Sequence, residues 1–333
     1  MSEAALRIAR AGPLVTVQDR GRHGYRRYGV SVSGPMDWTA HALALRLAGC
    51  GADDPAFEIG PGGITVEAEG APVRLGVAGL GHRAEWEREG RPRAVLPAPA
   101  RLVLEPGQRL TLRAGGEGVW GALAVRGLEA GEPILGSRAT NARTGLGPAR
   151  PEAGARYGCA ASEPGPPIAY AEPLHGDGSE GEDAPVLHAL PGPQHHLFPP
   201  SSRAAFTSAP YRVTPRTDRM AYRLEGPALS ASTHDIVSDA LTEGAMQVPG
   251  DGQPIVLAAD RAPTGGYPKI AVLSRASLPR LVQMRPGAEF RFAWTEAEAA
   301  REATAALERA IAAPERRTRQ SPAFLASLAK RRR

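Results

Sequence analysis

The sequence has only two cysteines and no long apolar run. Two cysteines, Cys50 and Cys159, are too few for a disulfide framework or a zinc site, so we expect two reduced thiols. No stretch of about 18 consecutive apolar residues occurs, so no membrane-spanning helix is expected. Residues 1–12 also lack the apolar run of a secretory signal. Together these absences predict a cytoplasmic protein that does not cross a membrane.

Outside the C-terminus the chain has no excess of basic residues. Residues 315–333 hold seven Arg or Lys and one Glu, a charge of +6, whereas the whole chain carries +5. The other residues therefore sum to about −1, which argues against a basic nucleic-acid-binding domain. The basic tail is read as a solvated terminus or as a segment that contacts a partner or an anion.

Several common motifs are also missing. There is no Gly-x4-Gly-Lys-Ser/Thr loop, no Gly-x-Ser-x-Gly elbow and no Ala-Met-Lys-Met-like biotin attachment segment. His195 and His196 are adjacent, so in a strand they would face opposite ways and make a poor metal pair. We therefore predict no metal site and no ATP site in this chain.

Glycine and proline are abundant instead. The 39 Gly and 32 Pro residues follow no collagen period, which favours many short strands and tight turns. Alternating patterns such as Ile64–Val66 and Leu110–Leu112 predict a mainly β protein. Two helices are expected: residues 38–47, capped by Asp37, and an Ala-rich helix that starts with the capping box Thr295–Glu298.

The domain boundaries follow from composition. Residues 161–184 are rich in Pro, Gly and Glu, which is typical of a linker. A weak repeat, Ile59-Gly60-Pro61 against Glu225-Gly226-Pro227, leaves open whether the two flanking β units are related. The expected segments are a first β-barrel unit at 1–160, a linker at 161–185, a second at 186–294, a helix at 295–313 and a basic tail at 314–333.

Two polar segments near the N-terminus are candidate ligand sites. Gln18, Asp19 and Arg20 open a Gly-rich stretch whose backbone N–H groups and guanidinium forks could hold a carboxylate or phosphate. The alternative is an exposed, charged hairpin loop. Asp37 begins a helix whose N-terminus could attract an anion, or it merely caps that helix.

Two further segments lie in the second half. Asp218 and Arg219 precede a strand and would usually form a solvated ion pair. Asp260 ends an apolar strand and is a candidate base or orienting carboxylate. Gly265 and Gly266 could bring backbone N–H groups close to a ligand. Lys269 is one of only two Lys among 40 basic residues, so it is either a functional amine or a chance survivor.

These segments resemble the family of the 5-oxoprolinase C subunit, also labelled allophanate hydrolase subunit 2 or biotin-dependent carboxyltransferase. The similar blocks occur in family order over about residues 6–294. They are Val17–Arg22, Gly29–Asp37, Leu135–Thr140, Leu190–Gln194, Asp218–Leu224, Gly244–Pro249 and Thr264–Lys269. Two stretches depart from the family: Ala262-Pro263 replaces the usual Gln-Thr, and residues 147–156 have lost the expected Gly-Arg-x-Leu-x-x-Gly-Asp.

The resemblance implies two cyclophilin-like β-barrel units with a few short helices, and partner subunits B and A. It implies an ATP-dependent opening of 5-oxoproline to glutamate, with ATP used by the complex. An alternative is carboxyl transfer from carboxybiotin to urea or a similar amide nitrogen, in which case biotin is the cofactor. A third is a regulatory binding protein without turnover.

The resemblance and the residue chemistry together give one set of candidate residues. A planar amide beside an anion needs donors for its carbonyl oxygen and a group that orients its nitrogen. The candidate catalytic residues are Asp260, Lys269 and Asp37. The candidate substrate-binding residues are Gln18, Asp19, Arg20, Arg138, Asp218, Arg219, Gln247, Thr264, Gly265, Gly266 and Tyr267.

Overall fold

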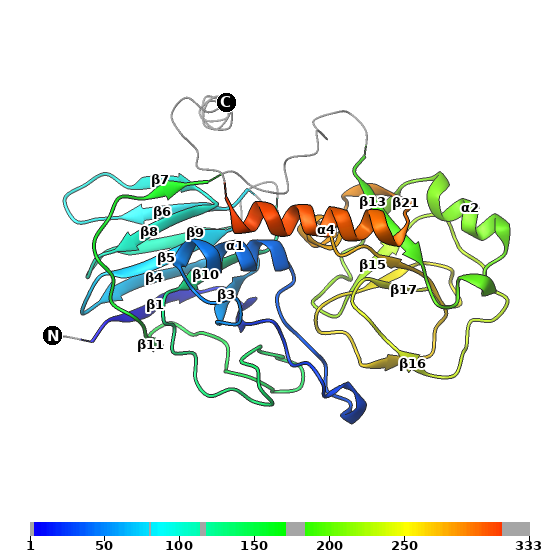
Figure 1. Cartoon of the computed structure of the whole chain (residues 1–333), viewed down its shortest axis with the longest axis horizontal. Coiled ribbons are helices and arrows are strands. Elements are labelled where there is room, and N and C mark those ends of the chain that lie inside the picture. Colours follow the sequence, from blue (N-terminus) through cyan, green and yellow to red (C-terminus); the bar gives the residue numbers. More distant parts are fainter. Residues whose placement is uncertain (1–2, 80, 114–117, 171–183, 315–333) are drawn as a thin grey trace. The chain divides into compact units, whose positions relative to one another are not determined.

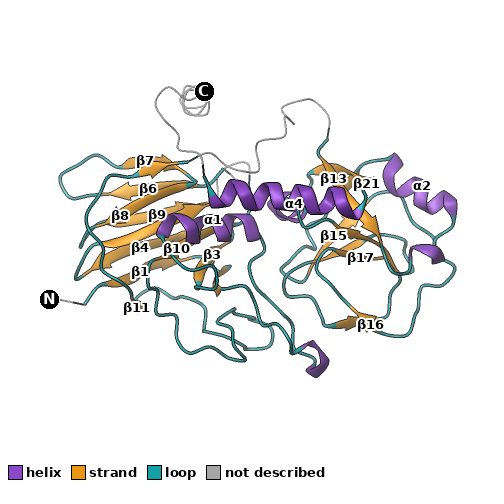
Figure 2. Cartoon of the chain, in the orientation of Figure 1, coloured by secondary structure: helices purple, strands orange, loops and turns teal. Residues whose placement is uncertain are grey.

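The computed structural model describes residues 3–79, 81–113, 118–170 and 184–314. Within these ranges the chain forms two compact units (Figure 1). Residues up to 20, 37–170 and 308–314 belong to the first unit, and residues 21–36 and 184–307 belong to the second. Figure 2 shows that strands predominate, so the prediction of a mainly β fold is confirmed. Four α-helices accompany the strands in the described ranges.

The first unit contains two six-stranded sheets in place of the expected barrel. One sheet has the order β11-β1-β4-β9-β6-β7 and the other β12-β8-β5-β10-β3-β2. The strands are β1 (Ala5–Ala11), β2 (Val15–Gln18), β3 (Ala56–Ile59), β4 (Ile64–Glu69), β5 (Val73–Ala78), β6 (Arg83–Glu87), β7 (Ala94–Pro97), β8 (Ala100–Leu104), β9 (Arg109–Arg113), β10 (Gly121–Val125), β11 (Arg156–Gly158) and β12 (Ile168–Ala169).

Alternating side chains build the core of this unit. In β4 the residues Ile64, Val66 and Ala68 are buried, while their neighbours are partly exposed. Because successive side chains of a strand point to opposite faces, this period of two gives the sheet one apolar face. Core residues from both sheets, including Leu6, Phe57 and Leu123, form one buried cluster.

Helix α1 (Trp38–Ala48) covers part of the second sheet, and it matches the helix predicted at residues 38–47. The Asp37 carboxylate accepts hydrogen bonds from the backbone N–H groups of Thr39 and Ala40, both at 2.9 Å, which satisfies two otherwise free donors. Gly76 in β5 allows the helix to approach closely, since a side chain there would collide with the carbonyl oxygen of Ala44.

The second unit contains a closed seven-stranded barrel in the order β13-β20-β17-β18-β15-β14-β21. Its strands are β13 (Val186–Pro191), β14 (Tyr211–Val213), β15 (Ala221–Glu225), β17 (Ala245–Gln247), β18 (Ile255–Leu257), β20 (Lys269–Leu273) and β21 (Glu289–Trp294). The helices of this unit are η1 (Arg26–Tyr28), η3 (His195–Leu197), α2 (Pro200–Ser208) and α3 (Leu278–Gln283), and the short strands β16 (Asp239–Ala240) and β19 (Thr264–Gly265) form a separate ribbon.

Aromatic side chains fill one side of the barrel. Phe206 of α2 stacks on Phe292 of β21 with ring centroids 4.6 Å apart, and it lies 4.7 Å from Trp294. Tyr211 adds a tilted contact to Phe292 at 5.2 Å. Such offset and tilted pairs stabilise a core beyond the apolar area that they bury, so α2 is held firmly against the barrel.

Three segments outside these cores bear on the expected domain layout. Residues 21–36 group with the second unit, although they lie in the sequence of the first. Within segment 161–185, Ile168–Ala169 form β12 and pair with β8, while residues 171–183 lie outside the described ranges. Helix α4 (Ala297–Ala312) falls within the helix expected at 295–313, and the basic tail from residue 315 is not described. In the described ranges, none of the helices combines the length and apolar character needed to cross a membrane.

Candidate functional site

Lys269 is the most deeply buried cation of the candidate set. It starts β20, its side chain is 2% exposed, and its Nζ atom lies 2.9 Å from Oδ2 of Asp239. Gln194 joins the same group, because its Nε2 donates to Asp239 Oδ2 at 3.3 Å and its Oε1 accepts from the backbone N–H of Lys269. A buried ammonium needs a nearby anion, and Asp239 supplies it.

Asp239 differs from its partner in exposure. Its side chain is 45% exposed, so water reaches the carboxylate but hardly reaches the lysine. The Lys269 hydrogen bond, the backbone N–H of Ala240 and the Gln194 amide hold the pKa of Asp239 below its usual value. Asp239 is therefore ionised at neutral pH, and its hydrogen bond fixes the direction of the Lys269 side chain.

Gln247 lies beside Lys269 in the barrel, since the two residues are register partners of β17 and β20 at a local irregularity. Its side chain is 7% exposed, and its Nε2 hydrogen-bonds to none of the described residues. An added Cβ on Gly265 would lie 2.7 Å from this Nε2, so glycine leaves room for the carboxamide. A buried amide without an acceptor is costly, which marks Gln247 as a donor available to a ligand.

Asp260 is bound to Arg219 in a forked ion pair. Arg219 Nε donates to Oδ2 at 2.8 Å and Nη2 donates to Oδ1 at 3.2 Å, with side chains 12% and 9% exposed. Arg219 Nη2 also donates to the carbonyl oxygen of Gly34 at 2.7 Å. Asp218 accepts hydrogen bonds from the backbone N–H groups of Met220 and Ala221.

The Gly-rich segment after Asp260 forms one strand of the ribbon. Thr264 and Gly265 pair with Ala240 and Asp239, so the ribbon brings Gly265 opposite the carboxylate that binds Lys269. Gly266 accepts a hydrogen bond from the backbone N–H of Ile236. Tyr267 is 41% exposed and thus borders the surface next to this group.

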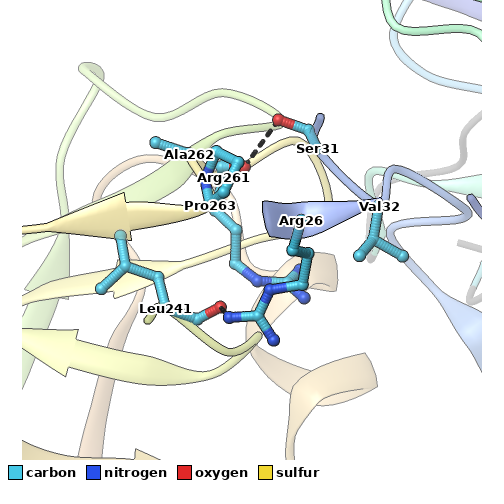
Figure 3. Close-up of a pocket in the computed structure, with 7 residues that line it drawn as sticks. All are labelled: Arg26, Ser31, Val32, Leu241, Arg261, Ala262 and Pro263. Atoms are coloured by element: carbon cyan, nitrogen blue, oxygen red, sulfur yellow. Dashed lines mark hydrogen bonds between the residues drawn. The ribbon is translucent and has the colours of Figure 1, made fainter. Parts of the chain in front are cut away.

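A small pocket adjoins the ribbon in the second unit, since Leu241 directly follows β16 and Pro263 directly precedes β19 (Figure 3). It is a shallow, open depression: its empty space of about 140 Å³ includes open solvent, and it encloses no room for a water molecule. Arg26 and Arg261 supply its charge, and the Ser31 hydroxyl donates to the carbonyl oxygen of Arg261 at 2.9 Å. The lining residues are Arg26, Ser31, Val32, Leu241, Arg261, Ala262 and Pro263.

The first unit gathers another part of the candidate set at the end of β2. Gln18 is fully buried and donates to Thr16 Oγ1 at 3.0 Å and to the carbonyl oxygen of Thr140 at 2.9 Å. Asp19 accepts from the Ser137 hydroxyl at 2.6 Å and from the backbone N–H of Arg138 at 2.5 Å. These contacts fasten the loop around residue 138 to β2.

Three other predicted residues have structural partners. Arg138 Nε donates to the carbonyl oxygen of Gly131 at 2.6 Å, whereas Asp19 is bound by the backbone N–H of Arg138. Arg20 forms an exposed ion pair with Asp53 at 3.1 Å, and such pairs contribute little to stability. Asp37 uses Oδ1 to cap α1 and also accepts the Thr39 hydroxyl at 2.6 Å. Capping thus accounts for the position of Asp37.

His41 on α1 was not predicted. It is 4% exposed, and neither ring nitrogen hydrogen-bonds to any described residue. Burial lowers its pKa from 6.5 to about 4; the negative charge of Asp19 opposes this shift and the positive charge of Arg20 adds to it. The imidazole is therefore neutral at pH 7.

Sequence reasoning also missed Asp239 and the two pocket residues Arg26 and Arg261. Asp239 opens the short strand β16, 30 residues before Lys269, and no local sequence pattern links the two. Its role follows from the closed barrel and the ribbon, which are long-range features. Arg261 could have been found from the sequence, because it directly follows Asp260 in the Gly-rich candidate segment.

Comparisons with known proteins agree with this architecture. The family model for the carboxyltransferase domain, subdomain A and B, matches residues 28–294. The 5-oxoprolinase C subunit of Escherichia coli (strain K12) is 35% identical over 294 residues, covering 86% of this chain and 90% of the relative. The 5-oxoprolinase C subunit of Haemophilus influenzae is 33% identical over 283 residues, covering 83% and 87%.

Solved structures give the same fold. The crystal structure of TTHA0988 is 34% identical with a TM-score of 0.75, covering 87% of this chain and 56% of that one. The Kluyveromyces lactis urea carboxylase has a TM-score of 0.82 at 24% identity, covering 93% of this chain and 29% of that one, and this likeness concerns the fold alone. The chain thus spans about half of the first protein and under a third of the second. Because the family model and two near-full-length relatives all match, this chain belongs to the carboxyltransferase domain family, subdomain A and B.

Proposed function

We propose that this chain is the C-type subunit of an ATP-dependent, cytoplasmic 5-oxoprolinase, which opens 5-oxo-L-proline to L-glutamate together with subunits A and B. The observation that carries the proposal is the 35% identity to the Escherichia coli 5-oxoprolinase C subunit, which extends over 90% of that relative. ATP is used by the assembled complex, and the proposal assigns no ATP site to this chain.

The group around Lys269 supports a role in binding a planar amide. Lys269 has three N–H donors, and one of them is directed to Asp239. Gln247 adds an amide nitrogen with no acceptor in the described ranges. Opening a lactam breaks its C–N bond and adds water, and negative charge gathers on the carbonyl oxygen. Donors held in a buried site stabilise that charge strongly, and Lys269 and Gln247 fit this role.

The remaining candidate residues act in other ways under this proposal. Asp239 and Gln194 fix the direction of the Lys269 ammonium. Arg219 holds the Asp260 carboxylate in place just after β18. From this position Asp260 would orient the lactam nitrogen of the substrate. Asp37 caps helix α1 through its Oδ1 atom.

The test is glutamate release from 5-oxoproline by the purified complex with ATP, measured with all subunits and with each one left out. The expected result is activity that depends on this chain and falls about 100-fold in Lys269→Met. Full activity of the other subunits without this chain would contradict the proposal.

A second candidate is carboxyl transfer to urea or a similar amide nitrogen, with carboxybiotin as donor. It is favoured by the family description and by 26% identity to the Lachancea kluyveri urea amidolyase, over 92% of this chain and 18% of that protein. The reaction would break the N–C bond of carboxybiotin and form an N–C bond to the acceptor, while a proton moves from the acceptor nitrogen to the biotin nitrogen. Carboxylated urea formed from carboxybiotin by an assembled complex that releases no glutamate would favour this function.

A further inference from the structure

Two arginine side chains converge in the small pocket of the second unit (Figure 3). Arg26 comes from η1 and Arg261 from the turn that follows β18, so 235 residues of sequence separate them in the chain. Figure 3 shows their guanidinium groups side by side. Two like charges repel more strongly in a partly buried site than in water. A bound anion would offset this repulsion.

Most of the donors of this pair are unused. Arg26 Nη2 donates to the carbonyl oxygen of Leu241, and Arg261 Nη1 donates to those of Ala258 at 3.1 Å and Ala259 at 3.4 Å. The Nε atoms and the second Nη atoms donate to nothing within the described ranges. A guanidinium carries five N–H groups in a fixed fork that matches carboxylate and phosphate oxygens.

The surrounding protein compensates the two charges only in part. Burial lowers the pKa of Arg261; the nearby Glu243 and Asp260 oppose this shift, and the charge of Arg26 adds to it. Burial raises the pKa of Glu243, whereas Arg261, Arg275 and Arg219 oppose that shift, so four arginines surround two carboxylates here. Neither arginine of the pocket forms an ion pair with a carboxylate of the described residues. Positive charge therefore prevails at the pocket.

The pocket walls are fixed by further contacts. Ser31 donates to the carbonyl oxygen of Arg261, and the backbone N–H of Leu241 donates to that of Pro263 at 2.9 Å. These bonds hold the loop of residues 21–36 and the segment after β18 in one arrangement. We propose that Arg26 and Arg261 form a binding site for a small oxyanion, which would lie between the two guanidinium forks at the open side of the pocket. The site adjoins the ribbon that carries Asp239 and Gly265, and its occupation by an anion does not depend on the function proposed above.

The test is isothermal titration of the full-length chain with sodium acetate, sodium bicarbonate and sodium phosphate, each against sodium chloride at equal ionic strength. We expect saturable binding of at least one oxyanion with a Kd of about 1 mM, and none of chloride. Preference for acetate or bicarbonate would identify a planar carboxylate-type ligand. Preference for phosphate would identify a tetrahedral one.

Variants assign the binding to the pocket. Arg26→Gln should weaken it about tenfold or more, because half of the guanidinium donors are lost. The control is Arg27→Gln, which removes the same charge from the next residue, whose guanidinium lies over the Tyr28 ring and does not line the pocket. Arg26→Lys keeps the charge but loses the forked N–H donors, so it should also weaken binding. It replaces Arg26→Gln in the test if that variant does not fold.

Two results would overturn the proposal. One is a response to all three oxyanions that equals the response to chloride in the folded wild-type chain. The other is an equal loss of binding in Arg27→Gln and Arg26→Gln. Neither depends on ATP, partner subunits or turnover, so a failure here is distinct from a failure of the oxoprolinase assay.

Discussion

The Nζ atom of Lys269 lies 2.9 Å from the carboxylate of Asp239, and only the carboxylate side of this pair reaches water. If the ammonium stabilises charge on a substrate, Lys269→Met should lower turnover of the assembled complex about 100-fold. Stability should change little, because an apolar side chain replaces a buried ion and leaves Asp239 solvated. Steady-state kinetics beside thermal melting separates the two effects.

Asp239→Asn tests whether this carboxylate positions the lysine. The neutral amide still accepts a hydrogen bond but no longer compensates the charge, so kcat should fall about tenfold with KM nearly unchanged. The matched control is Asp235→Asn, in the segment before β16, whose exposed side chain forms no hydrogen bond or ion pair with the described residues. Equal kcat losses in the two variants would show that loop charge, rather than Lys269, is responsible.

Arg219 and Asp260 should be strongly coupled in stability. Arg219→Met leaves a carboxylate that is 9% exposed without its fork, which should cost about 3 kcal/mol in the free energy of unfolding. Adding Asp260→Asn removes the unpaired negative charge, so the double variant should regain part of the lost free energy of unfolding. Urea unfolding of the single and double variants gives the coupling energy, and strict additivity would show that the pair does not act as a unit.

His41 makes stability depend on pH below neutrality. Its folded pKa of about 4 lies below the unfolded value of 6.5, so in this range the unfolded chain binds a proton that the folded chain does not. Stability from this residue is therefore fully present above pH 6.5 and falls as the pH drops towards 4, by up to about 3 kcal/mol.

The measurement compares urea unfolding at pH 7 and pH 5 for the wild-type chain and His41→Leu. The variant should lose less stability on acidification than the wild type. His188→Gln, at an exposed histidine, serves as the control and should keep the wild-type pH dependence. A parallel decline in wild type and His41→Leu would assign the effect to other groups.

Gly76 tests the close packing of α1 on β5. Gly76→Ala should destabilise the chain by about 2 kcal/mol, because its new methyl group meets the backbone of Ala44. Gly250→Ala is the control, since an added Cβ there meets nothing within 4 Å, and it should stay within about 0.5 kcal/mol of the wild type. Equal unfolding midpoints for the two variants would mean that the helix shifts freely.

Local features of the fold could be predicted from the sequence, whereas long-range ones could not. The capping residue Asp37 and helix α1 follow from neighbouring residues alone, and they agree with the structure. Lys269 was found by its rarity among 40 basic residues, and it is nearly buried. Its partner Asp239 depends on how the ribbon meets the barrel, and spacing along the chain carries no information about that.

The sequence identified some residues of the candidate site and missed others. Gln247 was named from the family resemblance, and the structure places it beside Lys269 across two strands. Asp260 was predicted as a base or an orienting carboxylate, and its forked bond to Arg219 depends on two segments 41 residues apart. His41 gave no signal, because a single histidine on an amphipathic helix looks like any other core position.

The barrel of the second unit closes where its first strand, β13, pairs in parallel with its last strand, β21. Val186 faces Arg291 and Ala189 faces Trp294, so the chain enters and leaves the barrel within about 10 Å along one seam. A barrel with adjacent ends can be joined to other sequences at either end without breaking its ladder of strands. The seam thus lets the barrel sit as an insertion in the chain, which returns to the first unit from residue 308 onward.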